Sequence, residues 1–195
     1  MSMPTTCFRR GAKAEPMQVL KDEHRVIEKV LDAAERRLRS AEVDRDFFLQ
    51  ALDFFQNFAD GCHHAKEEDE LFPVLEGAGI PQDGGPIEGL LRERQQGRYL
   101  LGLVRDNLDA ASTGNKVAEM NLKLAATQYI AMLRQHIIKE DDVLFVMADH
   151  VLGPEEQKLM LDAFERAERK NGKAEKHERY LALAEELAQR SVHVA

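Results

Sequence analysis

The amino-acid sequence predicts an all-α fold. Tryptophan is absent, and the 195 residues include only 3 tyrosines, 6 prolines and 12 glycines, a composition that favours helices over strands and turns. Apolar residues make up 44% of the chain and recur at helical spacing in long stretches. We expect a flexible N-terminus over residues 1–15, a four-helix domain over residues 16–152 and a helical C-terminal extension over residues 153–195.

The first half of that domain is expected to contain two helices. One begins at Pro16, a favourable first-turn residue, and carries an apolar stripe to about Ser40. The second follows a short polar connection, with Asp44 as candidate N-cap, and has a dense phenylalanine stripe. It ends near Pro73, before a loop rich in glycine and proline.

The second half is expected to contain two more helices. The first runs from about Pro86 to Ala111, and Arg94 falls inside its apolar stripe. The next begins after Asn115, a possible N-cap, and ends before Gly153. The halves are therefore similar in length and organisation.

The C-terminal extension is expected to form two shorter helices, broken near Asn171. They pack either on the outside of the domain or against a partner, and they could also form a dimerisation element. His177 and His193 are expected to be exposed polar residues without a chemical role.

Composition limits the partners. The chain has 35 acidic and 27 basic residues, a formal charge of −8, whereas nucleic acids and anionic membranes select basic surfaces. The apolar runs are too short to span a bilayer, and Arg9 and Arg10 are not followed by the apolar segment of a secretory signal. The two cysteines, Cys7 and Cys62, do not suggest a disulfide framework. We expect a soluble, cytoplasmic protein, monomeric or homodimeric, without a nucleic-acid or membrane partner.

One stretch of the second helix is echoed in the fourth. Residues 62–72 read CHHAKEEDELF and residues 136–145 read HIIKEDDVLF. Superposing them aligns identical residues, namely His63 with His136, Lys66 with Lys139, Glu67 with Glu140, Leu71 with Leu144 and Phe72 with Phe145. Each copy therefore carries a histidine and a glutamate at i and i+4, which share one face of a helix.

A second echo links the first and third helices. Residues 20–24 read LKDEH and residues 90–94 read LLRER, at an offset of 70 residues, close to the offset of 73 between the histidine-glutamate pairs. Two related helical hairpins packed about a pseudo-twofold axis would give this pattern. His24 interrupts the apolar stripe of its helix, and Arg94 is its counterpart.

Three histidines and two glutamates could thus converge in the core of the domain. Burial of an unpaired carboxylate is costly, so these groups need a positive centre or must turn to solvent. A pair of metal ions meets that need, and imidazole with carboxylate but no thiolate favours iron or manganese over zinc. The alternative is that both histidine-glutamate pairs are exposed hydrogen bonds. The residues concerned are His24, His63, Glu67, His136 and Glu140.

These residues carry a resemblance to a known family. Glu23 with His24, the stretch HHAKEE at residues 63–68, and His136 with Glu140 are similar to the hemerythrin-like HHE cation-binding domain, over about residues 17–150. The resemblance implies an antiparallel up-down-up-down four-helix bundle that holds a non-haem di-iron centre bridged by two carboxylates. It implies metal-ligand roles for His24, His63, Glu67, His136 and Glu140, with His64 as a further ligand or a residue at the rim.

The chain departs from the family pattern at Arg94. The family usually has a Glu-His pair here, whereas a guanidinium stays protonated and has no lone pair for a metal. Three outcomes follow: a second iron with an open coordination position, a single ion with Arg94 against Glu67 or Glu140, or Glu93 as an oxygen ligand. We expect a retained but weakened second site.

The resemblance also implies a function, namely binding or sensing of O2, NO or peroxide. One alternative is an iron- and oxygen-responsive interaction module that contacts a protein partner through the C-terminal helices. Another is a di-iron redox enzyme, peroxidase- or catalase-like, in which Tyr99 or Tyr129 acts near the metals unless it simply fills the core. Manganese or zinc could replace iron, and Cys62 is expected to be buried and inert.

Overall fold

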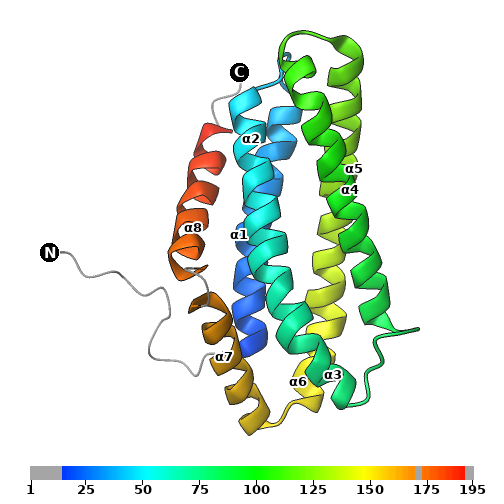
Figure 1. Ribbon diagram of the computed structural model, residues 1–195, viewed down its shortest axis with the longest axis vertical. Coiled ribbons are helices and arrows are strands. Elements are labelled where there is room, and N and C mark those ends of the chain that lie inside the picture. Colours follow the sequence, from blue (N-terminus) through cyan, green and yellow to red (C-terminus); the bar gives the residue numbers. More distant parts are fainter. Residues whose placement is uncertain (1–14, 170–172, 192–195) are drawn as a thin grey trace, which may run out of the picture.

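The computed structural model describes residues 15–169 and 173–191, and this part of the chain is helical and contains no strand (Figure 1). The all-α prediction is confirmed. The elements, in order, are α1 (Pro16–Leu38), α2 (Arg45–Phe54), π-helices η1 (Phe55–His64) and η2 (Glu67–Leu71), α3 (Phe72–Gly77), α4 (Pro86–Ser112), α5 (Lys116–Lys139), π-helix η3 (Glu140–Leu144), α6 (Phe145–Val151), α7 (Pro154–Arg169) and α8 (Lys173–Arg190).

Four long helical segments lie side by side along the longest axis of the molecule (Figure 1). They are α1, the run from α2 to α3, α4, and the run from α5 to α6. The most extensive contact is between α4 and α5, while α1 packs against α5 and η1, and α2 packs against α4. None of the described helices combines the length and apolar character needed to cross a membrane.

Both predicted N-caps are confirmed. Asp44 Oδ1 accepts a hydrogen bond from the backbone N–H of Phe47 at 2.9 Å. Asn115 Oδ1 accepts from the backbone N–H groups of Val117 and Ala118, each at 3.1 Å. These bonds satisfy donors that the first turn of a helix cannot pair internally. Gly114, in the turn before Asn115, has a φ of 94°, a conformation that glycine adopts without strain.

The core consists of two apolar clusters at different heights. One contains the aromatic residues of α2 and η1 with the facing residues of α4 and α5, and the other lies around α3, α6 and the start of α1. In each of the four segments, buried polar residues lie between the part that joins one cluster and the part that joins the other. We call these residues the polar layer: Glu23, His24, His63, His64, Lys66, Glu67, Arg94, His136 and Glu140.

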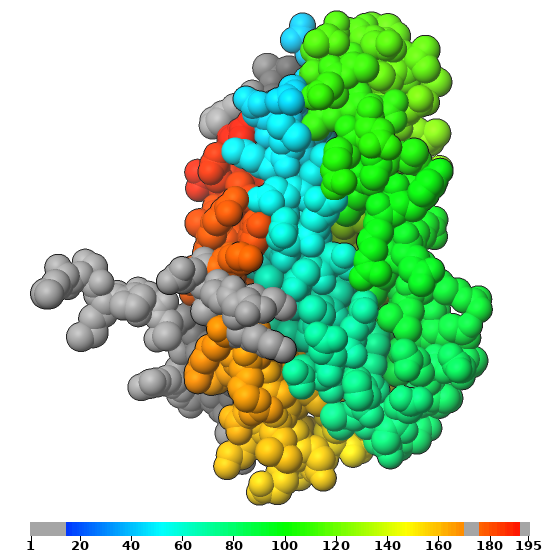
Figure 2. Space-filling view, viewed as in Figure 1, coloured from blue at the N-terminus to red at the C-terminus, as the bar shows by residue number. Residues whose placement is uncertain are grey.

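The C-terminal helices pack on the outside of the four segments, the first of the two expected arrangements. Phe164 of α7 joins the cluster around α3, and Tyr180 and Leu187 of α8 join the other cluster. α8 contacts α1, α2 and η1, and α7 contacts α1 and η2. In the space-filling view, α7 and α8 lie against the run from α2 to α3 (Figure 2). The predicted break at Asn171 lies outside the described residues, and so does His193.

Two leucines of α5 offer a matched test of the core. Leu122 is fully buried, whereas Leu124 is 58% exposed. We expect Leu122→Ala to lower the free energy of unfolding by about 2–5 kcal/mol, because it removes buried apolar contacts and leaves a cavity. Leu124→Ala should change it by less than about 0.5 kcal/mol. Urea unfolding followed by circular dichroism measures both; equal losses would contradict the packing of α5.

Candidate metal centre

The backbone departs from α-helical geometry where the polar layer crosses the second and fourth segments. η2 begins at Glu67 and η3 begins at Glu140, so the two sequence copies share a π-helical turn as well as residue types. Such turns widen the helix locally and are frequent at functional sites. The residue spacing did not predict them, because i and i+4 spacing is compatible with an ordinary α-helix.

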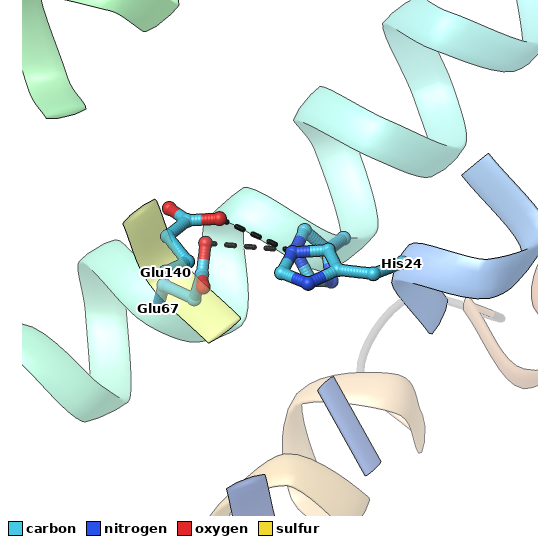
Figure 3. A group of neighbouring side chains, drawn as sticks. His24, Glu67 and Glu140 are labelled. Atoms are coloured by element: carbon cyan, nitrogen blue, oxygen red, sulfur yellow. Dashed lines mark hydrogen bonds and ion pairs between the residues drawn. The ribbon is translucent and has the colours of Figure 1, made fainter. Parts of the chain in front are cut away.

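Four side chains converge in the layer. His24, His63, Glu67 and Glu140 each offer one ligand atom, and these atoms lie within 4.8 Å of one another. Figure 3 shows His24, Glu67 and Glu140 pointing toward one another. Nε2 of His24 lies 3.1 Å from Oε2 of Glu140, and Nε2 of His63 lies 3.7 Å from Oε2 of Glu67. We call this group the four-residue cluster.

Arg94 contacts both glutamates of the cluster. Its Nη2 donates to Oε2 of Glu67 and, at 2.9 Å, to Oε1 of Glu140. Its Nη1 donates to Oε1 of Glu68 at 2.9 Å, and the guanidinium lies over the ring of Phe72, 4.8 Å from its centroid. This is the contact expected in the second of the three outcomes for Arg94.

His136 also contacts Glu140, and Glu93 contacts His136. His136 Nε2 is 3.0 Å from Oε1 of Glu140, but His136 is outside the four-residue cluster. Glu93 accepts hydrogen bonds from Nδ1 of His136, at 2.9 Å, and from Lys139. Glu93 therefore orients an imidazole in this structure and does not offer an oxygen to the cluster.

Carboxylates outside the four-residue cluster orient the imidazoles of His24, His63 and His136. Nδ1 of His24 donates to Asp141 at 2.7 Å, and Nδ1 of His63 donates to Glu23 at 2.9 Å. Nδ1 of His136 donates to Glu93 in the same way. The Nε2 atoms are thereby directed inward, an arrangement that metal-binding histidines commonly show. Sequence reasoning did not identify the roles of Glu23 and Asp141, although Glu23 and Glu93 are aligned in the repeat.

Burial leaves specific ligand atoms without partners. Among the described residues, Nε2 of His63 and Oε1 of Glu67 are buried and have no hydrogen-bond partner, and both belong to the four-residue cluster. A buried polar atom without a partner costs about 1–3 kcal/mol. Nε2 of His136 also lacks a hydrogen bond and has only its ion-pair contact with Glu140. The residues present therefore fit a cation that accepts imidazole and carboxylate ligands.

The two buried carboxylates and their neighbours shift one another's pKa values. Burial and the neighbouring Glu140 raise the pKa of Glu67. Burial would raise the pKa of Glu140, but His136, His24 and Arg94 hold it well below its usual range. Burial lowers the pKa of His24 and of His136, yet their carboxylate partners outweigh it and raise each from 6.5 to about 9. Protonated histidines thus compensate the carboxylates when no metal is bound.

The C-terminal helices reach the outer hydrogen bonds of the cluster. Lys66 donates to Glu23 and to Glu168 of α7, each at 2.5 Å, and Nε2 of His177 of α8 lies 3.1 Å from Oε1 of Glu23. The side chain of His177 is only 19% exposed. The expectation of an exposed polar residue at position 177 was wrong, because the sequence does not show that α8 places it beside Glu23.

Glu23, Glu168 and His177 also form a second group with metal-ligand geometry. The Lys66 ammonium lies against two of its carboxylates and supplies the positive charge there.

His64 and Tyr129 border a cavity beside the layer, with Arg94 and His136. Nδ1 of His64 is 3.3 Å from Oδ1 of Asp60, and burial together with Arg94 lowers the pKa of His64 well below its usual range. His64 is outside the four-residue cluster, as in the rim position considered for it. Tyr99, by contrast, is 66% exposed, so both expectations for it, a role near the metals and a place in the core, were wrong. Cys62 is buried, as expected.

The raised histidine pKa values predict the pH dependence of the metal-free protein. The contribution of His24 and His136 is fully present below pH 6.5 and is lost as the pH rises through about 9. With a chelator present, we expect the melting temperature to fall between pH 6.5 and 9. A double variant with glutamine at both positions should show a shallower fall. A melting temperature that is constant or rises in the unaltered protein would contradict the site electrostatics.

Comparison with known proteins agrees with this geometry. The family described as the hemerythrin HHE cation binding domain matches residues 15–148. Uncharacterized proteins of Mycobacterium bovis and Mycobacterium tuberculosis are 30% identical over 148 residues, which cover 73% of this chain and 57% of each relative, so the chain spans less than two thirds of their length. No solved structure matches significantly. The family match covers more than half of the residues, and the chain therefore belongs to the hemerythrin HHE cation-binding family.

Proposed function

We propose that this protein binds iron in the four-residue cluster and uses it to bind or sense O2, NO or peroxide. The observation that carries the proposal is the pair of buried, unpartnered ligand atoms, His63 Nε2 and Glu67 Oε1, within a group of four potential ligands. We further propose that the four long segments form the up-down-up-down bundle expected for the family.

The donor set supports iron. Two imidazoles and two carboxylates converge, and the cluster contains no thiolate among the described residues. This set suits iron or manganese better than zinc, which proteins often hold with cysteine. Bound iron would supply a redox-active centre with affinity for O2, NO and peroxide.

The protein side chains have separate tasks in this proposal. His24, His63, Glu67 and Glu140 hold the ion, while Asp141 and Glu23 fix two of the imidazoles with Nε2 directed inward. The cavity bordered by His64, Arg94, Tyr129 and His136 lies beside the layer, but none of the four cluster residues lines it. Burial of the surrounding residues limits access of bulk water.

A second candidate is an iron- and oxygen-responsive interaction module. Its support is the contact of His177 of α8 with Glu23, and of Glu168 of α7 with Lys66, which itself donates to Glu23. Glu23 in turn orients His63 of the cluster. In that case, removal of iron should increase hydrogen exchange in α7 and α8 without any catalytic turnover. Sustained consumption of added peroxide by unchanged protein would instead favour a redox enzyme.

The ligand assignment predicts the effect of removing one histidine. His63 is fully buried in the cluster, whereas His150 is exposed. We expect His63→Ala to abolish stoichiometric iron binding and His150→Ala to leave it unchanged. Iron per chain, measured by mass spectrometry of the metal after anaerobic reconstitution, checks both. Full iron occupancy in folded His63→Ala protein would refute the assignment.

The proposed small-molecule function predicts a spectral response. Addition of NO to the ferrous protein should change its visible absorption, and removal of NO should reverse the change. His63→Ala protein treated in the same way should show no response. Identical spectra with and without NO in the iron-loaded protein would exclude NO as a ligand, and the same comparison applies to O2.

A further inference from the structure

The two halves of the domain match in three dimensions. In the first half, His63 donates to Glu23, which also accepts from Lys66. In the second half, the aligned residues make the same contacts: His136 donates to Glu93, which also accepts from Lys139. The sequence repeat is therefore matched by a repeat of hydrogen bonds. Each half contributes one imidazole and one glutamate of the repeated histidine-glutamate pair to the layer.

The two halves differ at the position that His24 occupies in the first half. His24 belongs to the four-residue cluster in the first half, and the aligned residue in the second half is Arg94. By this symmetry, a second ion would lie between Glu67, Glu140 and His136. The Arg94 guanidinium already contacts one oxygen of each glutamate, Oε2 of Glu67 and Oε1 of Glu140, and it is almost fully buried.

The formal charge of the layer also favours one metal ion over two. The carboxylates of Glu67 and Glu140 with the guanidinium of Arg94 give a formal charge of −1, so one divalent ion leaves +1 and two ions leave +3. Glu68, which also accepts from Arg94, brings this single-ion sum to zero, and a protonated His136 beside Glu140 returns it to +1, still two charges below the two-ion case. The other acids around the layer have partners of their own, such as Lys66 for Glu23 and Lys139 for Glu93. An uncompensated buried charge costs several kcal/mol, so the layer accommodates one ion more readily than two.

We infer that Arg94 is a built-in cation in place of a second metal ion, and that the centre is mononuclear. The single ion is held by His24, His63, Glu67 and Glu140, and His136 contacts Glu140 instead of a metal. Arg94 thereby determines the number of metal ions in the centre. This inference rests on the proposed iron binding, and it replaces the sequence-based expectation of a weakened second iron site.

Metal stoichiometry in variants at position 94 tests the inference. The unaltered protein should bind one iron per chain, and its ferric form should give the paramagnetic resonance signal of an isolated high-spin ion. Arg94→His removes the cation and adds an imidazole, so it should bind two irons per chain and lose that signal through coupling of a bridged pair. Arg94→Lys keeps a positive charge and should still bind one.

Matched substitutions in the two halves give a second test. His63→Ala should abolish iron binding, whereas His136→Ala should retain one iron per chain. Glu23→Gln should weaken iron binding by about 10–100-fold, the usual effect of removing a carboxylate that orients a ligand, whereas Glu93→Gln should weaken it by less than about 3-fold. Circular dichroism before reconstitution confirms that each variant is folded.

The outcomes separate the inference from the function on which it rests. Two irons per chain in the unaltered protein, or equal losses in the two halves, would overturn the mononuclear centre and leave iron binding intact. One iron in folded Arg94→His protein would show that Arg94 does not set the stoichiometry, and would overturn the inference. An absence of iron from the unaltered protein after reconstitution would overturn the proposed function and the inference together.

Discussion

The burial of two carboxylates in one layer is the constraint on which the structure depends. Glu67 and Glu140 have no exposed surface, and each needs positive charge within a few ångströms. Arg94 serves both, and His24 and His136 serve Glu140. The apolar clusters above and below the layer exclude water from these contacts. Stability and metal binding therefore compete for the same carboxylate oxygens, because any bound ion must replace or join the cations already present.

Among the described residues, the hydrogen bonds that Glu168 and His177 of the C-terminal helices make with the polar layer fall in one half. Glu168 and His177 bury the Lys66–Glu23 pair, whereas the aligned Lys139–Glu93 pair of the other half is more exposed. The covered half is the one that contains His24 and His63. Helices α7 and α8 lie outside the family match over residues 15–148, yet they belong to the surroundings of the cluster. The extension is thus part of the protein that sets the environment of the metal ligands.

Much of the fold and of the cluster could be predicted from the sequence, because both depend on local spacing. Asp44 and Asn115 have the short polar side chains that cap helices, and the i, i+4 pairs placed His63 with Glu67 and His136 with Glu140 on common faces. The rest depends on tertiary contacts that leave no local signal. The hydrogen bond from His24 to Asp141 and the approach of His177 to Glu23 join distant parts of the chain. The π-helical turns are local, but their residue spacing is also compatible with an ordinary α-helix.

Family membership does not determine how many ions the centre holds. The family match indicates cation binding over residues 15–148, but in our proposal the number of ions depends on how the buried charge is balanced. One residue can alter that balance, because Arg94 supplies a permanent positive charge and directional donors to both glutamates. A guanidinium cannot change its oxidation state or bind a small ligand as a metal ion does. Arg94 would therefore leave redox change and ligand binding to the single ion. The pseudo-symmetric repeat would then support an asymmetric centre, in which one half helps to bind the single ion and the other half supplies the fixed charge of Arg94.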